Sequence, residues 1–542
     1  MHHLSSVVKS TDVVGESSPA SSYLILDLPS MDYAHNLKES KLADLAQTTS
    51  SLDTVFHFSP PSVFNSPEYR QFCDSLGPAV RHVVLNESCR GLGMADVSAY
   101  SHKLRTIRTD LFPRLQGGEE AGSLEVLEAK MYSDKMELGD NVVRGVTGLK
   151  INVRPHPENE DRIKLSEVVM YDEAGAERDL FEGDKDEADE RAEYKSAISE
   201  ALEYAKQFSP PPCQSHDSNT LTNYPIVTFL GTGSSVPSKY RNVSCILLET
   251  APDVFIMLDC GEGSLGQMVR VFGVGRTREI LAKLRCVYIS HMHADHHLGL
   301  INIIQARARE VRDPEDKLVI ISTDRLMPFL TYYHTKFEPL LAQCEFVKCE
   351  RLILYNEMDP KTLVENPDRK LQKLYPAELS RMLENLGLSE FYTSRAIHCP
   401  NAFCVAFRTK EGYKVAYSGD TRPCEKFREI ARWGGPPDLL IHEATMEHFM
   451  MYDAIIKKHT TFTEAIKVST TFIGNNNFDP FQEGKLMGAK FTMLTHFSQR
   501  YAKMPLLGEI EGQPNVGIAF DTMSVSPRTF NLIPSLYPAL SR

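Results

Sequence analysis

The chain has 542 residues, of which 42 % are hydrophobic and 24 % are charged, values that are ordinary for a globular protein. No apolar run approaches the roughly 20 residues that a membrane-spanning helix needs, and no secretory signal is visible, so we expect neither a membrane protein nor a secreted one. The 11 cysteines show no C-x-x-C spacing, which indicates reduced thiols in an intracellular protein.

The net charge of −13 is unevenly distributed along the chain. Residues 221–542 hold 37 Lys and Arg against 35 Asp and Glu, whereas residues 1–220 hold 22 against 37. An acidic overall balance argues weakly against non-specific binding of nucleic acid, although it leaves room for a local basic groove. The length predicts two to four domains.

The first 222 residues carry no metal motif. We predict that residues 1–20 are disordered and that residues 21–139 form a small domain with a βαβ-like rhythm. Its His57 and His82 are interpreted as isolated structural or surface histidines. Residues 140–222 are predicted to be an acidic segment, then a helix near 192–207, then a linker over 208–222. The predicted elements of the small domain are strands at 23–28, 54–58 and 82–85 and a helix at 67–76.

The sequence pattern changes from linker-like to strand-like at Pro225, and residues 223–542 are predicted to form one domain. A strand at 226–230 runs into the glycine turn Gly231–Ser235, which is only a weak nucleotide-binding signal because it is not G-x-G-x-x-G. A second strand, over 254–258, runs into a turn that can place Asp259 beneath a ligand histidine and orient it. The alternative is that Asp259 has only a structural role, in an Asx turn.

The run from Ser290 to Gly299 contains the pattern H-x-H-x-D-H directly after an apolar strand over 286–289. His291, His293, Asp295 and His296 can surround a pair of divalent ions, and zinc suits such mixed nitrogen and oxygen donors. A histidine-rich surface loop is the alternative, which this spacing against a strand end disfavours. His297 falls outside the pattern and is interpreted as a packing or surface residue.

Further candidate ligands follow other predicted strands. His398 precedes the strand at 403–408, Asp420 follows the strand at 414–417, and His496 follows the strand at 491–494. A fourth strand, at 439–441, ends in His442-Glu443-Ala444-Thr445. Each residue alone is unremarkable, but enzymes built on sheets place their chemistry at strand ends, so the set predicts a dinuclear metal site.

Taken together, these residues resemble the metallo-β-lactamase superfamily and, within it, the ribonuclease Z family of tRNA 3′-endonucleases. Beyond the ligand order, His442–Thr445 is similar to the family's H-E-A-T motif, and His459-Thr460-Thr461 is similar to its H-S-T motif with Thr460 in place of Ser. Pro237–Asn242 matches its P-x-K-x-R-N loop, and the run from His496 to Tyr501 is also typical. The resemblance implies an α/β fold, the αββα sandwich of the metallo-β-lactamases, over residues 223–542.

The resemblance also implies a ligand set and a mechanism. One zinc would be held by His291, His293, His398 and Asp420, and the other by Asp295, His296, Asp420 and His496, with Asp420 bridging. Asp295 would orient the attacking hydroxide or accept its proton. His459, steered by Glu443, would protonate the leaving oxygen.

The activity that the resemblance implies is endonucleolytic removal of the 3′ trailer from precursor tRNA, leaving a 3′-hydroxyl on the tRNA. The residues that would contact the RNA are Lys239, Arg241, Asn242 and Arg500. The alternative for the loop that holds Lys239, Arg241 and Asn242 is a solvated hairpin tip without a binding role. Two alternatives stay open. They are another phosphodiesterase of the metallo-β-lactamase fold and a non-catalytic tRNA-binding isoform.

Residues 21–139 resemble the later part of the degenerate amino-terminal half found in long-form members of the family. Val83-Val84-Leu85-Asn86 lies where Met493-Leu494-Thr495-His496 lies in the other half, with Asn86 in place of a ligand. The arm-bearing part that precedes this half in long forms has no counterpart here, so we expect a shortened chain. The resemblance implies a nuclear or mitochondrial location, or possibly the cytosol, and leaves monomer and homodimer open.

Overall fold

The computed structural model divides the chain into two compact units, which we describe separately. Unit 1 comprises Met1–Ala95 and Gly117–Asp172, and unit 2 comprises Asp96–Gln116 and Glu173–Arg542. The structure describes residues 22–34, 37, 52–86, 89, 95–115, 141–145, 149–151, 163–165, 192, 196–200, 203, 223–238, 240–354, 377–469, 487–500 and 513–537. The predicted disordered N-terminus over 1–20, the linker over 208–222 and Lys239 lie outside these residues.

Unit 1 contains a four-stranded parallel sheet in sequence order. Its strands are β1 (Ser22–Leu26), β2 (Leu52–His57), β3 (Arg81–Val84) and β4 (Val142–Arg144), and its helices include α2 (Met31–Ala34), α4 (Pro61–Phe64) and α5 (Pro67–Ser75). The predicted elements are confirmed to within two residues. Strand β4 lies beyond the domain boundary predicted at residue 139, so the sheet extends past it. A separate hairpin joins β5 (Leu149–Ile151) to β6 (Ile163–Leu165).

A buried histidine pair lies at the core of unit 1, so the interpretation of His57 and His82 as isolated residues was wrong. His57 Nε2 lies 2.9 Å from His82 Nδ1, and His57 Nδ1 lies 2.9 Å from the Tyr69 hydroxyl. The side chain of Cys73 also lies close enough to share a metal ion with them. Both nitrogens of His57 have hydrogen-bond partners already, so we interpret the cluster as a structural one.

This pair predicts acid sensitivity of unit 1. Burial lowers the pKa of His57 to about 3, with a smaller contribution from His82, and burial lowers the pKa of His82 to about 4. The unfolded chain binds both protons below about pH 6.5, whereas the folded unit does not, so stability is complete above pH 6.5 and falls on the order of a few kcal/mol as the pH drops toward 4. Hydrogen exchange of the segment around Tyr69 should accelerate between pH 7 and pH 5 after correction for intrinsic rates. Unchanged protection would contradict the prediction.

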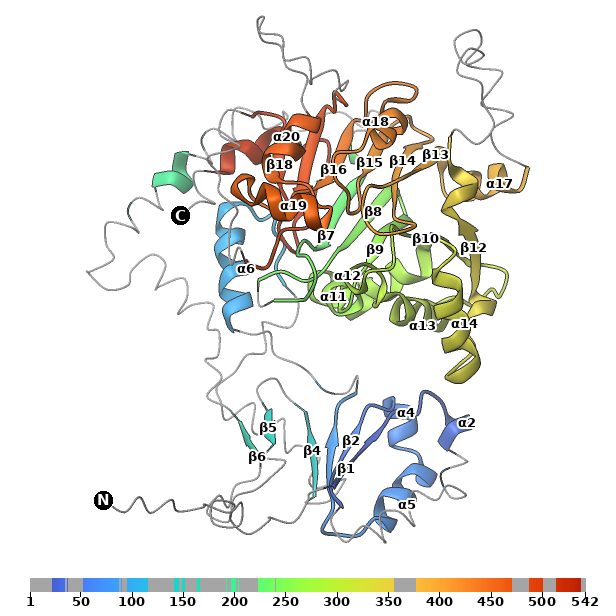
Figure 1. The fold of residues 1–542 in the computed structure, drawn as a ribbon. Coiled ribbons are helices and arrows are strands. Elements are labelled where there is room, and N and C mark those ends of the chain that lie inside the picture. Colours follow the sequence, from blue (N-terminus) through green and yellow to red (C-terminus); the bar gives the residue numbers. More distant parts are fainter. Residues whose placement is uncertain are drawn as a thin grey trace, which may run out of the picture. The chain divides into compact units, whose positions relative to one another are not determined.

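Unit 2 is a sandwich of two sheets with helices on both outer faces (Figure 1). The first sheet has the order β12 (Cys344–Lys348), β11 (Leu318–Ser322), β10 (Leu284–Ile289), β9 (Val254–Cys260), β8 (Cys245–Ala251), β7 (Ile226–Gly231) and β19 (Ser524–Val525). The second has the order β13 (Leu388–Arg395), β14 (Phe403–Thr409), β15 (Lys414–Tyr417), β16 (Leu439–Glu443), β17 (Phe491–Thr495) and β18 (Val516–Ile518). The predicted αββα sandwich is confirmed.

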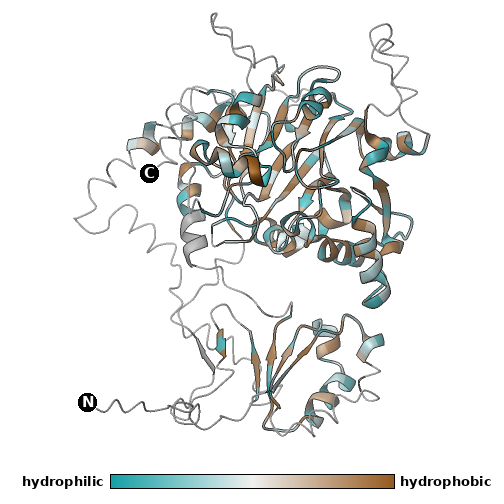
Figure 2. Ribbon diagram, viewed as in Figure 1, coloured by the Kyte–Doolittle hydropathy of each residue, from teal (hydrophilic) through white to brown (hydrophobic). Residues whose placement is uncertain are grey.

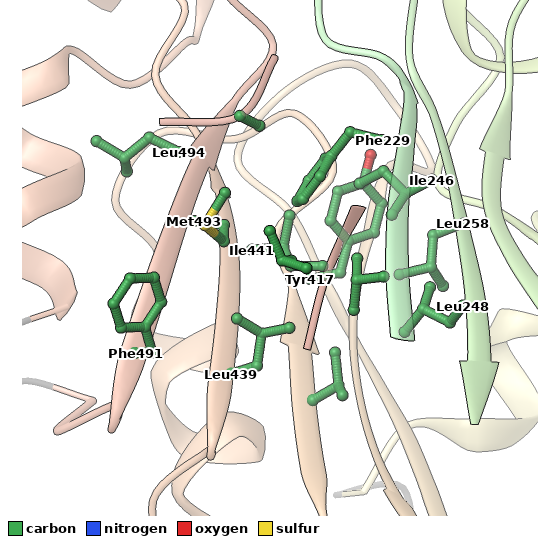
Figure 3. Close-up of a cluster of buried hydrophobic side chains, with 14 of the residues drawn as sticks. Phe229, Ile246, Leu248, Leu258, Tyr417, Leu439, Ile441, Phe491, Met493 and Leu494 are labelled. Carbon is green, nitrogen blue, oxygen red and sulfur yellow. The ribbon is translucent and has the colours of Figure 1, made fainter. Parts of the chain in front are cut away.

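Alternation along the strands builds this layering. In β8, Ile246 and Leu248 face the second sheet, whereas Leu247 faces the helices, because successive side chains of a strand point to opposite faces. Figure 3 shows the layer between the sheets, where Phe229 and Leu258 meet residues of the second sheet such as Ile441 and Met493. Burying each such side chain stabilises the fold by about 1.5–3 kcal/mol. The strands of both sheets are accordingly rich in hydrophobic residues (Figure 2).

Helices cover the two outer faces. The first sheet packs against α11 (Ser264–Lys283) and α13 (Leu300–Glu310), and the second packs against α18 (Glu425–Arg432). No helix within the described ranges is long and apolar enough to cross a membrane. Other helices among the described residues of the unit are α6 (Ala95–Ile107), α12 (Ala294–His297), α14 (Leu326–Lys336), η4 (Leu341–Gln343), η5 (Cys349–Leu352), α17 (Ala377–Asn385), η6 (His448–Met450), α19 (Met451–Lys457), α20 (Phe462–Ser469) and η8 (Phe530–Leu536).

The carboxyl ends of the central strands share one edge in each sheet. Strands β9 to β12 are mutually parallel, and so are β15 to β18. Strand β13 runs the same way as β15, because both are antiparallel to β14. Every predicted ligand follows one of these strands, so all of them lie at the carboxyl-end edges of the two sheets.

Candidate metal centre

Asp420 lies at the centre of the predicted ligands. Its Oδ2 is 3.3 Å from His296 Nε2 and 3.6 Å from both His291 Nε2 and His398 Nε2, and its Oδ1 is 3.3 Å from His496 Nε2. The preceding Gly419 has φ +51°, and a Cβ there would lie 2.8 Å from the Ser290 Cβ, so only glycine fits between β15 and the histidine loop.

The other predicted ligands complete the cluster. His293 Nδ1 lies 3.0 Å from His398 Nε2, and Asp295 Oδ2 lies 3.5 Å from His496 Nε2 and 3.6 Å from His296 Nε2. The structure therefore brings together all seven residues that the sequence predicted as ligands. Six of them are buried, and His293 is exposed.

The arrangement of these nitrogen and oxygen atoms suits the binding of metal ions better than hydrogen bonding among the side chains. His291 Nε2 and Asp420 Oδ1 are buried and have no hydrogen-bond partner, which is costly for polar atoms. Two atoms that lie about 2.0–2.1 Å from one tetrahedral ion are about 3.3 Å apart, close to the separations around Asp420. Imidazole and carboxylate donors also form the mixed set that zinc accepts.

Asp259 orients His296, as the sequence predicted. Its Oδ2 accepts hydrogen bonds from His296 Nδ1 at 2.7 Å, from the Tyr417 hydroxyl at 2.7 Å and from Ser290 Oγ at 2.8 Å. This bond places the His296 proton on Nδ1 and leaves Nε2 free to face Asp420. The backbone of Asp259 has φ +54°, and that of His496 has φ +62°, so both residues hold strained conformations that are typical of functional sites.

Two more histidines are fixed in the same way by partners that the sequence did not reveal. His398 Nδ1 donates to the Lys458 carbonyl at 2.9 Å, and His496 Nδ1 donates to Thr445 Oγ1 at 2.9 Å. Thr445 in turn donates to Glu443. In both histidines Nε2 is left facing the metal centre. The H-E-A-T motif already contained Thr445, whereas a backbone carbonyl leaves no trace in a sequence.

Asp295 has one further partner. The backbone N–H of Ser235, in the turn after β7, donates to Asp295 Oδ2 at 2.6 Å. Ser235 has φ +67°, which aims its N–H toward the metal centre. The glycine turn that resembled a weak phosphate loop therefore positions a carboxylate of the site.

The buried Glu443 and the partly buried His459 form an ion pair beside the candidate metal centre. His459 Nδ1 lies 3.2 Å from both carboxylate oxygens of Glu443, and the N–H of Thr460 donates to Glu443 Oε2 at 3.1 Å. Burial alone would lower the pKa of His459, but the Glu443 carboxylate raises it to about 9. His459 is therefore protonated at neutral pH, with Nδ1 committed to Glu443 and Nε2 left to carry the mobile proton.

The structure gives two of the predicted RNA contacts, Arg241 and Asn242, hydrogen bonds within the protein. Arg241 is 3 % exposed, and its Nη1 donates to Thr232 Oγ1 at 2.6 Å and to the Ala519 carbonyl at 3.0 Å. Its guanidinium also stacks 4.7 Å from the centre of the Phe497 ring, so this arginine fastens the loop to the core and does not face a phosphate. Asn242 is likewise engaged, since its Nδ2 donates to the Glu262 carbonyl at 3.0 Å.

Arg500 is exposed, and its Nη1 contacts Met450 Sδ at 3.8 Å. Of the four predicted RNA contacts it is the one whose described position suits a phosphate. His297 packs edge-on against Phe329, with ring centres 5.3 Å apart, in agreement with its interpretation as a packing residue.

Part of the chain matches a family model, and most of it is similar to curated proteins. Residues 226–491 match a family model described as Anti-Pycsar protein Apyc1. The chain is 32 % identical to "Ribonuclease Z, mitochondrial" of Drosophila melanogaster, over 98 % of this chain and 64 % of that protein. It is 35 % identical to "Zinc phosphodiesterase ELAC protein 2" of Rattus norvegicus, over 90 % of this chain and 52 % of that protein.

A solved structure is also similar. The crystal structure of a long form RNase Z from yeast superimposes with a TM-score of 0.64 and 24 % identity, over 95 % of this chain and 71 % of that chain. At this identity the match shows the fold. The chain spans between 52 % and 64 % of the two curated relatives named above.

Proposed function

Because this chain is a homologue of the ribonuclease Z proteins over most of its length, we propose that it is a zinc-dependent endoribonuclease that removes the 3′ trailer from precursor tRNA. The observation that carries the proposal is the clustering of six other candidate ligands around Asp420, beside the Glu443–His459 pair. Two ions per chain fit the two halves of this cluster.

The chain's own residues would divide the work as follows. His291, His293 and His398 would hold one zinc, and Asp295, His296 and His496 the other, with Asp420 shared between them. When bound, such a pair of ions activates a water molecule and stabilises charge on a phosphodiester in an in-line displacement.

Asp295 would orient the attacking water. Its Oδ2 is fixed by the Ser235 N–H, so the carboxylate does not rotate freely. As the water oxygen bonds to phosphorus, the bond from phosphorus to the 3′-oxygen of the tRNA breaks. His459 would protonate that oxygen from Nε2 while Glu443 stabilises the imidazolium. The products are a tRNA with a 3′-hydroxyl and a trailer with a 5′-phosphate.

The direct test is cleavage of a precursor tRNA that carries a 3′ trailer. We expect the zinc-loaded protein to release the trailer in one cut and Asp295→Ala to abolish cleavage, because that variant loses both a ligand and the group that orients water. Product ends are read by sequencing and by sensitivity of the trailer to a 5′-phosphate-dependent exonuclease. Binding of precursor without any cleavage would favour the non-catalytic tRNA-binding alternative instead.

A second candidate is a phosphodiesterase with another substrate. The relative from Rattus norvegicus is named for zinc phosphodiesterase activity in general, and residues 226–491 match a model with a different description. Hydrolysis of simple phosphodiesters with no cleavage of precursor tRNA would favour this candidate. For location we propose a mitochondrial or nuclear pool, and the name of the relative from Drosophila melanogaster supports the first.

A further inference from the structure

Among the described residues of unit 2, the two most exposed large hydrophobic side chains, Phe449 and Tyr452, lie in a segment beside the candidate metal centre. Phe449 in η6 is 75 % exposed and Tyr452 in α19 is 77 % exposed, and Ile455 and Ile456 in α19 are 55 % and 59 % exposed. The three- and four-residue spacings place these side chains on one face, while Ala454 is buried on the other. We call this face the η6–α19 surface. Contiguous apolar patches of this kind usually mark a binding site.

This surface is rigidly connected to the catalytic residues. The segment that carries the η6–α19 surface is closed at its two ends by a β-bridge between Met446 and Thr461. The Phe462 N–H also donates to the Met446 carbonyl at 2.7 Å. At the end of α19 the Lys458 carbonyl accepts from His398 Nδ1, and Lys458 Nζ donates to the His398 carbonyl at 3.1 Å. The segment therefore begins directly after the H-E-A-T motif and ends at His459.

Basic side chains flank the aromatic ones. Lys457, Lys458 and Arg500 are exposed, and Arg500 reaches Met450 in η6. Exposed aromatic rings with cationic neighbours are typical of proteins that bind single-stranded nucleic acid, because the rings stack on bases and the cations pair with phosphates. Lysine is depleted at protein–protein interfaces, whereas Lys457 and Lys458 lie beside these rings, so the surface favours a nucleic acid over a protein partner.

We propose that the η6–α19 surface is a stacking platform for the unpaired nucleotides on either side of the scissile phosphodiester. The proposal rests on the proposed function and adds a way of holding the substrate. Phe449 and Tyr452 would stack on bases, and Lys457 and Arg500 would contact the phosphates between them. The platform would then fix the single strand across the metal centre, whatever the identity of its bases.

The test compares an RNA substrate with a small phosphodiester. Phe449→Leu and Tyr452→Leu remove the rings and keep apolar side chains. Stacking on an aromatic ring contributes enough for each variant to lose about tenfold in kcat/KM on precursor tRNA, mainly through KM, with a larger loss in the double variant. Hydrolysis of bis(p-nitrophenyl) phosphate should change less than about twofold, since that diester needs no base stacking. Tyr452→Phe, which keeps the ring, should cleave precursor tRNA with the wild-type kcat/KM, unlike Tyr452→Leu.

The matched control is Tyr332→Leu, an aromatic residue of α14 that is 61 % exposed. It should leave both substrates unaffected. If the wild-type protein cleaves precursor tRNA and the double variant cleaves it equally well, the platform is disproved while the proposed function stands. If the wild-type protein hydrolyses the small diester but never cuts precursor tRNA, both proposals fail.

Discussion

Replacing Asp420 by alanine is expected to reduce bound zinc from about two ions per chain to one at most, and to lower the cleavage of precursor tRNA at least about a thousandfold. The carboxylate lies 3.3–3.6 Å from nitrogens of His291, His296, His398 and His496, so it is the one group that both ions would share. Without it, Asp295 is the one carboxylate left among the candidate ligands, and it lies beside His296 and His496 only. Zinc is measured by inductively coupled plasma mass spectrometry after dialysis.

Two comparisons make this prediction specific. Asp438→Asn alters a carboxylate that accepts from the Lys414 N–H at 2.7 Å before the start of β16, at the opposite end of the strand from the metal centre, and it should retain two ions. Asp259→Asn should lower metal affinity about 10- to 100-fold without removing a ligand. If Asp420→Ala retains two ions, the bridging role is wrong.

The clustering of the candidate ligands was predictable because they are local signals repeated in a regular fold. Asp420 and His496 each follow a run of apolar residues, and parallel strands end at a common edge. Knowing the strands was therefore enough to expect the side chains near each other. The H-x-H-x-D-H loop itself supplies four of the seven candidate ligands within six residues.

The groups that orient these ligands were harder to predict. The carbonyl of Lys458 and the N–H of Ser235 act through the backbone, so their residue types carry no information about their roles. Tyr417 looked like an ordinary strand residue, yet its hydroxyl donates to Asp259. Such partners depend on how distant loops meet, which sequence spacing does not report.

Arg241 shows the opposite error. Arg241 lies in the loop Pro237–Asn242, and the resemblance of this loop to the P-x-K-x-R-N motif predicted a contact with RNA. Its burial against Phe497 became visible only when β7 and the end of β17 were placed side by side. The exposed rings of η6 and α19 escaped sequence analysis for a related reason, because apolar residues at helical spacing are more often part of a core.

Unit 1 repeats the strand order of β15 to β18 and shows which positions the chemistry needs. His57 pairs with Val84 across β2 and β3, as His442 pairs with Leu494 across β16 and β17. In this correspondence, Phe58 takes the place of Glu443 and is 45 % exposed. The backbone pattern persists where the acidic side chain is lost, so the sheet alone does not create the site.

His459→Ala is expected to lower kcat for precursor tRNA about 10²- to 10⁴-fold while zinc content stays at the wild-type level. The imidazole is held by Glu443 at 3.2 Å, and the pKa of about 9 keeps it protonated at neutral pH, as the proposed proton donor to the 3′-oxygen has to be. Glu443→Gln should produce a smaller loss, because the neutral amide still positions the ring but no longer stabilises its charge.

The leaving group separates proton donation from a merely structural role. A p-nitrophenolate leaves as a stable anion and needs no proton, so His459→Ala should hydrolyse bis(p-nitrophenyl) phosphate at close to the wild-type rate. The variant should fail only where an alkoxide must depart. His459 Nδ1 also lies 3.9 Å from Asp420 Oδ2. An equal loss on both substrates would therefore show that His459 supports the metal centre and that another group supplies the proton.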